Sequence, residues 1–96
     1  MRLLYIVTYD ITDDKRWRRV FKLMRGYGDH LQYSVFRCEL SERERADLTG
    51  KLAEMIKKDE DQVLLFPLGP AGGRREAGVY VVGRAYTPAE HEAVIV

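Results

Sequence analysis

The chain begins with an apolar segment that has almost no polar position. Leu3 to Tyr9 is a run of aliphatic, β-branched and aromatic residues that ends at Asp10. A run of this length and composition is typical of a strand covered on at least one face. The pattern therefore predicts a central, buried strand over residues 2–9.

A helix is predicted to follow directly. Thr12 is placed to act as its N-cap, and Asp13 and Asp14 favour the positive end of the helix dipole. Apolar residues then recur at spacings of three and four, and Gly28 is a typical helix stop. This periodicity predicts a helix to about Tyr27, with one apolar stripe formed by Trp17, Val20, Phe21, Met24 and Tyr27.

Residues 30–40 resemble a strand, but their apolar positions do not keep one alternation. A bend would explain this slip in phase, and so would a tight hairpin near Tyr33-Ser34. The pattern alone leaves both alternatives open.

A second helix is predicted after this region. Ser41 followed three residues later by Glu44 matches a capping box. The helix should run to about Lys58, although Gly50 weakens its middle by about 1 kcal/mol relative to alanine. Its apolar stripe consists of Leu48, Leu52, Met55 and Ile56.

Two further strands are predicted, at Val63–Leu68 and Val79–Val82, with a glycine-rich loop at 69–76 between them. The chain then finishes on the apolar segment Ala93-Val94-Ile95-Val96. Such a segment either closes the protein's own sheet or adds to a sheet edge of a second copy. Both alternatives stay open.

The order of these elements contains two strand–helix–strand units. A chain of 96 residues is enough for one domain with one modest core. We therefore predict an α+β sandwich of two helices on one sheet. The single domain should span residues 1–96, with about 85–96 as a C-terminal extension.

The composition, with 46% apolar and 32% charged residues, indicates a soluble, folded chain. No apolar run approaches the roughly 18 residues of a membrane span, and no signal peptide is evident, so we expect a cytoplasmic protein without a membrane partner. Cys38 is the only cysteine, which excludes an intrachain disulfide and favours a buried apolar role.

Basic residues gather on the first predicted helix. No acid interrupts the set Lys15, Arg16, Arg18, Arg19, Lys22 and Arg25. These side chains could form a solvated face, or they could hold phosphates, and Arg16 and Arg19 share one helix side. Arg74 and Arg75 in the glycine-rich loop would add a second contact. Aromatic residues are not interleaved with the basic ones as in base-stacking platforms, so sequence-specific base reading is not indicated.

Asp10 is the candidate for chemistry, because it lies between a buried strand and a helix start. Such a carboxylate can be a metal ligand, a general base or a structural cap. One carboxylate is too few to hold Mg²⁺ firmly. Two copies of Asp10 facing each other across a dimer axis would hold it better, and a bound water could then attack a phosphodiester.

Two short signatures stand at a characteristic separation. Tyr9-Asp10-Ile11 is followed by Asp13-Asp14, Arg16 and Arg19, and the second signature is Gln32-Tyr33-Ser34-Val35-Phe36. Together with Tyr27-Gly28 they resemble the small CRISPR-associated adaptation proteins of the Cas "two" family. The resemblance covers about residues 1–68.

The resemblance implies a ferredoxin-like βαββαβ domain that forms a homodimer with its sheets packed together. It favours the hairpin at residues 30–40 and a C-terminal strand that crosses onto the partner. It places the family's metal-binding, catalytic aspartate at Asp10. It also implies nucleic-acid contacts at Arg19 and Arg16, and it places Ser34 and Phe36 near the dimer site. We add Arg18 and Lys15 of the basic helix to the candidate nucleic-acid contacts, and Tyr9 to the residues near the dimer site.

The function that the resemblance implies is a Mg²⁺-dependent endonuclease acting on RNA or double-stranded DNA. The same dimer would be the scaffold between integrase subunits when new spacers are captured in antiviral defence. Two alternatives are a non-catalytic DNA-binding scaffold and a toxin-like ribonuclease of the same fold. Trp17 and His30 depart from the family, because some members carry basic residues there.

Overall fold

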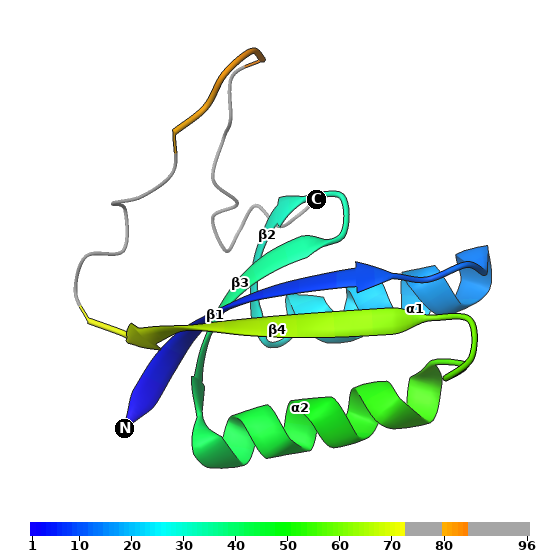
Figure 1. The fold of residues 1–96 in the computed structure, drawn as a ribbon, viewed down its shortest axis with the longest axis horizontal. Helices are drawn as coiled ribbons and strands as arrows, with labels where there is room; N and C mark the ends of the chain where they lie inside the picture. Colours follow the sequence, from blue (N-terminus) through cyan, green and yellow to red (C-terminus); the bar gives the residue numbers. More distant parts are fainter. Residues whose placement is uncertain (73–79, 85–96) are drawn as a thin grey trace.

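Six regular elements follow one another in the computed structural model, which describes residues 1–72 and 80–84 (Figure 1). They are β1 (Arg2–Asp10), α1 (Asp14–Arg25), β2 (Gly28–Gln32), β3 (Val35–Ser41), α2 (Glu42–Met55) and β4 (Gln62–Pro70). No helix in the described ranges is long and apolar enough to cross a membrane.

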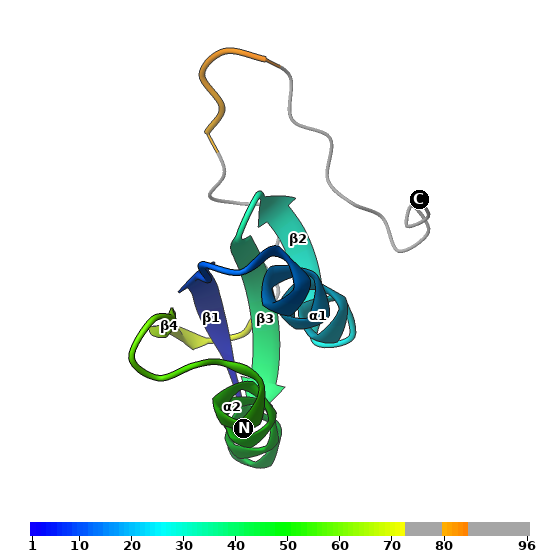
Figure 2. The same ribbon diagram turned by 90° about the vertical axis from the view of Figure 1, so that its right-hand side faces the viewer.

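The strands form one antiparallel sheet in the order β2-β3-β1-β4. β1 therefore lies in the interior of the sheet, as its apolar run predicts. Both helices pack on the same face, and the other face is left uncovered by helices (Figure 2). This arrangement confirms the predicted ferredoxin-like βαββαβ sandwich.

The hydrophobic core lies between the helices and the covered face. Its largest side chains with almost no solvent exposure are Phe36, Met24, Leu48, Val7 and Val20. Cys38 is buried among them, as predicted, and burial raises the pKa of its thiol to about 12. A thiol with this pKa is protonated at neutral pH and behaves as a small apolar residue.

Residues 28–41 form a β-hairpin, which explains the irregular alternation of apolar residues in residues 30–40. β2 and β3 pair antiparallel on either side of Tyr33-Ser34, and their register shifts between His30 and Gln32. The shift explains why no single alternation fits the segment. Of the two alternatives that the sequence leaves open, the hairpin is therefore the correct one.

The predicted N-cap of the first helix is wrong. Asp13 takes this position, because its Oδ2 accepts a hydrogen bond from the backbone N–H of Arg16 at 2.9 Å. Thr12 has a different partner, since its own N–H donates to Asp61 at 3.0 Å. The helix also ends at Arg25, earlier than its apolar stripe predicts.

The capping box of α2 is confirmed. The hydroxyl of Ser41 accepts from the Glu44 N–H at 3.1 Å, and the Ser41 N–H donates to Oε1 of Glu44 at 2.8 Å. α2 ends at Met55, before the predicted Lys58, and the Ile56 N–H closes its last turn on Leu52.

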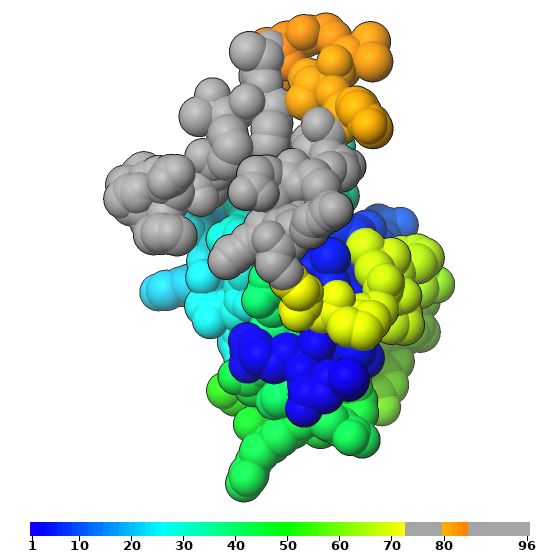
Figure 3. Space-filling model, turned by 90° about the vertical axis from the view of Figure 1, so that its left-hand side faces the viewer, coloured from blue at the N-terminus to red at the C-terminus, as the bar shows by residue number. Residues whose placement is uncertain are grey.

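β4 is longer than predicted, because it continues through Pro67 to Pro70. An edge strand tolerates proline, whose missing N–H can face away from the sheet. Its end lies beside the N-terminus, where the Ala71 N–H donates to the carbonyl of Arg2 at 3.0 Å (Figure 3).

Part of the predicted C-terminal half is not confirmed. Residues 80–84 form neither helix nor strand, so the described part of the predicted strand Val79–Val82 is wrong. The loop arginines Arg74 and Arg75 and the extension at 85–96 lie outside the described residues. The strand that would cross to a second copy therefore stays a prediction.

Candidate functional site

Asp10 is the last residue of β1, and its side chain is exposed. Tyr5, Val7 and Tyr9 of the same strand are buried in the core beneath the helices. Because side chains alternate along a strand, Asp10 points to the opposite, uncovered face. It pairs with Gln62 at the start of β4. The carboxylate is therefore accessible at one end of the open face.

The described residues of one chain form no metal-binding cluster. Within residues 1–72 and 80–84, no three His, Cys, Asp or Glu side chains come close enough to hold an ion. Mg²⁺ is commonly bound by one or two carboxylates and several waters. Asp10 can supply one such ligand, and a second copy of the chain would supply an identical carboxylate.

The open face beside Asp10 is mainly apolar where β1 and β4 pair, whereas β3 places Arg37 and Glu39 on the same face. Ile6 of β1 pairs with Phe66 of β4, and Thr8 pairs with Leu64, which places these four side chains on one face. Leu64 is 42% exposed and Phe66 is 46% exposed. We call Ile6, Thr8, Leu64 and Phe66 the open-face patch. Exposed apolar surface of this kind often marks a protein–protein interface.

The basic residues of α1 fall into two groups. Lys15, Arg18 and Arg19 are exposed, and within the described residues no ion pair engages them. Their charges are free to attract phosphate groups. Arg16 differs, because only 17% of its side chain is exposed and it is paired within the chain.

Asp61 is the partner of Arg16. Its side chain is fully buried, and its Oδ2 accepts a hydrogen bond from Nε of Arg16 at 2.8 Å. The backbone N–H groups of Thr12 and Lys57 donate to the same carboxylate at 3.0 and 2.9 Å. These donors, Arg16 first, hold the pKa of Asp61 well below its usual range. Asp61 thus ties the segment after Asp10 to the segment before β4.

The sequence pattern did not predict this hydrogen-bond network, because Asp61 is the last of three consecutive acidic residues, Asp59-Glu60-Asp61. Acidic residues before a strand are usually solvated, so their position does not indicate burial. The only signal was indirect, namely the placement of Asp61 directly before a strand that could pair with β1. The predicted phosphate contact of Arg16 stays a prediction, and its observed partner is intramolecular.

Aromatic side chains gather at the same end of the sheet as Asp10. Tyr33 of the hairpin turn stacks on Trp17 of α1, with ring centroids 5.1 Å apart and planes at 26°. Trp17 also stacks on Phe21 at 5.3 Å and 13°. The indole N–H of Trp17 donates to the hydroxyl of Ser34 at 3.0 Å. We call Tyr33, Trp17 and Phe21 the aromatic stack.

None of the three residues expected near the dimer site lies on the open face. Tyr9 and Phe36 are buried under the helices, and Ser34 is buried beside Trp17. The hydroxyl of Tyr9 has no hydrogen-bond partner among the described residues, and burial, with Tyr33 nearby, raises its pKa. These residues therefore lie behind Asp10, and they support its end of the sheet from the core side.

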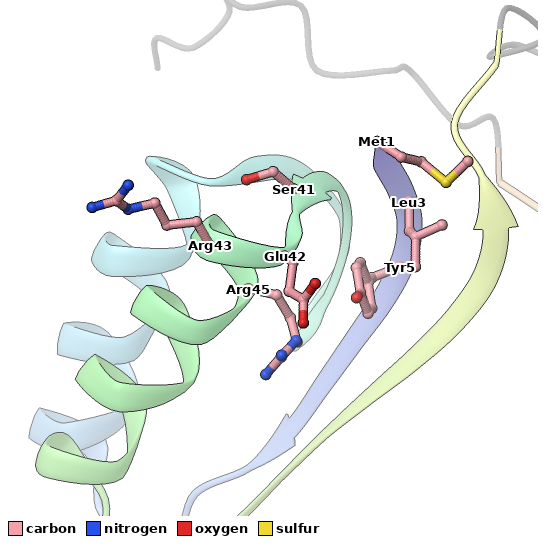
Figure 4. Close-up of a pocket in the computed structure, with 7 residues that line it drawn as sticks. All are labelled: Met1, Leu3, Tyr5, Ser41, Glu42, Arg43 and Arg45. Carbon is pink, nitrogen blue, oxygen red and sulfur yellow. The ribbon is translucent and has the colours of Figure 1, made fainter.

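A pocket of about 610 Å³ lies at the opposite end of the sheet, between the start of β1 and the start of α2. Figure 4 shows the Glu42 carboxylate on the side of α2 that faces Tyr5, whereas Arg43 points away from β1. The lining carries both signs of charge. This pocket is separate from the site at Asp10.

Fold and site together define a small ferredoxin-like protein with an exposed strand-end carboxylate beside a basic helix. The family model described as "CRISPR associated protein Cas2" matches residues 1–75. The chain belongs to this family, as the two signatures around Asp10 and Ser34 indicate.

Relatives and solved structures agree with this assignment. The chain is 42% identical over 96 residues to the CRISPR-associated endoribonuclease Cas2 of Geobacter sulfurreducens, covering 100% of both chains. It is 42% identical over 92 residues to CRISPR-associated endoribonuclease Cas2 1 of Rhodospirillum rubrum, covering 96% of this chain and 89% of the relative. The crystal structure of Streptococcus pyogenes Cas2 at pH 6.5 has a TM-score of 0.72 at 30% identity, covering 83% of this chain and 99% of that one.

Proposed function

We propose that this protein is a Mg²⁺-dependent endoribonuclease that acts as a homodimer in a CRISPR system. The observation that carries the proposal is the position of Asp10, which is exposed at the end of the open-face patch. The relatives named endoribonucleases support RNA as the substrate, because they match the chain over nearly its whole length.

The dimer would form through the open-face patch. Packing two such faces together removes Leu64 and Phe66 from water, which stabilises the association. Asp10 lies at one end of the same face, so a two-fold axis near that end would bring two Asp10 carboxylates together. The site would then be complete only in the dimer.

The donor set fits Mg²⁺ in such a dimer. Two exposed carboxylates supply hard oxygen ligands and leave several positions for water. When bound, the ion would activate a water molecule and neutralise charge on the scissile phosphate. Asp10 would hold the ion, and the fully buried Asp61 would fix the segment that follows Asp10.

The exposed cations of α1 would bind the RNA backbone. Lys15, Arg18 and Arg19 have no ion-pair partner within the described residues, so phosphates can reach them without displacing an acid. Their position on the helix that follows Asp10 would align the backbone with the metal site.

A second candidate function is a non-catalytic scaffold that binds double-stranded DNA and an integrase during spacer acquisition. The observation that favours it is the single carboxylate, since the described part of one chain holds no metal cluster. In this case the basic helix would still bind phosphates, but Asp10 would have no role in cleavage.

A cleavage assay distinguishes the two candidates. Single-stranded RNA and double-stranded DNA are incubated with wild type, Asp10→Asn and the control Asp47→Asn, with Mg²⁺ or with a chelator. Asp47 is an exposed acid on α2 and receives the same chemical change. We expect Mg²⁺-dependent cleavage of RNA by wild type and Asp47→Asn, and none by Asp10→Asn. Equal rates for all three proteins, or no cleavage by a dimer that binds DNA, would reject the nuclease.

A further inference from the structure

Tyr33 is an exposed aromatic residue whose ring is nevertheless held in place. It is 74% exposed at the tip of the β2–β3 hairpin, yet one side of its ring stacks on Trp17 at 5.1 Å. Its carbonyl lies 3.1 Å from Nε2 of His30, which fixes the turn. A large ring that is both exposed and fixed presents an apolar surface with little entropy left to lose on binding.

The ring beneath Tyr33 is also fixed. The Trp17 indole donates to the buried hydroxyl of Ser34 at 3.0 Å, and its ring stacks on Phe21 at 5.3 Å. The guanidinium carbon of Arg25 lies 5.8 Å from the Phe21 ring centre. The aromatic stack is therefore anchored in the core on one side and flanked by a cation on α1.

The stack lies at the end of the sheet where Asp10 is found. The N–H of Tyr9 donates to the carbonyl of Ser34 at 3.2 Å, so the hairpin turn is adjacent to the last residues of β1. The cation that contacts the stack is Arg25, and the exposed Arg18 and Arg19 lie on the same helix but point in other directions than Trp17. A single-stranded nucleic acid fits this surface, because its bases can stack on the free face of Tyr33 while its phosphates contact the cations of α1.

We propose that Tyr33 is a stacking site for an unpaired base of a single-stranded nucleic acid. This inference rests on the proposed function and deepens it, because it selects single strands over duplexes. A paired base is already stacked on both sides and cannot cover the Tyr33 ring. The basic helix would supply affinity for any strand, and Tyr33 would add a preference for unpaired ones.

The test measures binding in a chelator, so that cleavage does not interfere. A fluorescent oligouridine, an oligothymidine, a duplex and an abasic strand of equal length are titrated by anisotropy. The variants are Tyr33→Ala, Tyr33→Phe, which keeps the ring, and the control Tyr80→Ala. Tyr80 is 96% exposed and belongs to no ring contact among the described residues.

We expect Tyr33→Ala to weaken single-strand binding by roughly fivefold to a hundredfold, the usual effect of losing one base–aromatic stack. Tyr33→Phe and Tyr80→Ala should bind as wild type, and the duplex and the abasic strand should not distinguish the variants. Trp17 is the only tryptophan, so its fluorescence should also be quenched by strands that carry bases. Tighter binding of the oligouridine than of the oligothymidine would identify RNA as the preferred ligand, and the reverse order would identify DNA.

Equal single-strand binding by wild type and Tyr33→Ala would overturn the stacking site while leaving the nuclease intact, since RNA cleavage is measured separately. An equal loss for duplex and abasic strands would also overturn it. The comparison with the abasic strand can be made with wild-type protein alone. If a base stacks on Tyr33, the wild type should bind the base-carrying strand at least about fivefold more tightly than the abasic strand. Absence of all nucleic-acid binding would overturn both proposals.

Discussion

The Nε of Arg16 lies 2.8 Å from Oδ2 of Asp61, although the two residues are 45 positions apart in the sequence. The carboxylate is fully buried, and it also accepts the N–H groups of Thr12 and Lys57. One side chain thus joins α1, the β1–α1 connection and the α2–β4 connection. Its position explains why a basic helix contains one arginine that is not free for phosphate.

Replacing Asp61 should destabilise the fold. Asp61→Ala leaves two backbone N–H groups and the Arg16 guanidinium without their buried acceptor, which should lower the free energy of unfolding by about 3 kcal/mol. Asp61→Asn, which retains one acceptor oxygen, should lose less. Urea denaturation measures both, with the exposed Asp59→Ala as the control, expected within about 0.5 kcal/mol of wild type. A wild-type midpoint for Asp61→Ala would contradict the role of the network.

The same pair predicts acid sensitivity. Hydrogen bonds, mainly from Arg16, lower the pKa of Asp61 in the folded protein, so the folded state binds fewer protons than the unfolded chain. This stabilisation is fully present above the unfolded pKa of about 3.9, and it is lost as the pH falls toward the folded pKa. The difference in stability between wild type and Asp61→Asn should therefore shrink below about pH 4. A difference that is constant from neutral to strongly acidic pH would refute this explanation.

Two glycines should respond in opposite ways to alanine. A Cβ at Gly28 would collide with the carbonyl oxygen of Arg37 and with Sγ of Cys38, so Gly28→Ala must push β2 away from β3. Gly50 lies within α2, and a Cβ added there would meet no atom within 4 Å apart from the backbone of its own helix, so Gly50→Ala should stabilise the helix by about 1 kcal/mol. Thermal unfolding should show a lower midpoint for the first variant and a higher one for the second. An unchanged or higher unfolding midpoint for Gly28→Ala would contradict the predicted collision between β2 and β3.

Most of the fold could be predicted because its signals are local. The capping box at Ser41, the apolar run of β1 and the stripe of α1 each depend on residues close together in the sequence. The hairpin at Tyr33-Ser34 was one of two alternatives, since a register shift and a bend break the alternation in the same way.

The candidate site was predicted less completely, because its parts come together only in the fold. The exposure of Asp10 could be expected at a strand end, but its orientation toward the open face depends on which face the helices cover. The aromatic stack joins Trp17 and Tyr33 across 16 positions, so no short-range pattern indicates it. Hydrophobic periodicity reports only on neighbours within one element, and contacts between elements lie outside its reach.

Salt dependence tests the basic helix independently of cleavage. If Lys15, Arg18 and Arg19 each neutralise a phosphate, the logarithm of the binding constant should fall linearly with the logarithm of the salt concentration. Arg19→Ala should reduce the slope by about one contact, whereas Arg43→Ala on α2 should leave it unchanged. Anisotropy titrations at several salt concentrations give both slopes. An identical slope for Arg19→Ala and wild type would remove Arg19 from the interface.

The open-face patch should determine the oligomeric state. Phe66→Glu places a charge in the centre of the proposed interface, where Phe66 is now 46% exposed beside Ile6. Burying that charge without a partner should weaken dimerisation by about a hundredfold or more. Light scattering coupled to size exclusion would then show a monomer, while the control Ala46→Glu on the exposed side of α2 stays dimeric. Because each chain supplies only one Asp10, RNA cleavage should fall together with the dimer fraction. A fully active Phe66→Glu monomer would show that one carboxylate is enough.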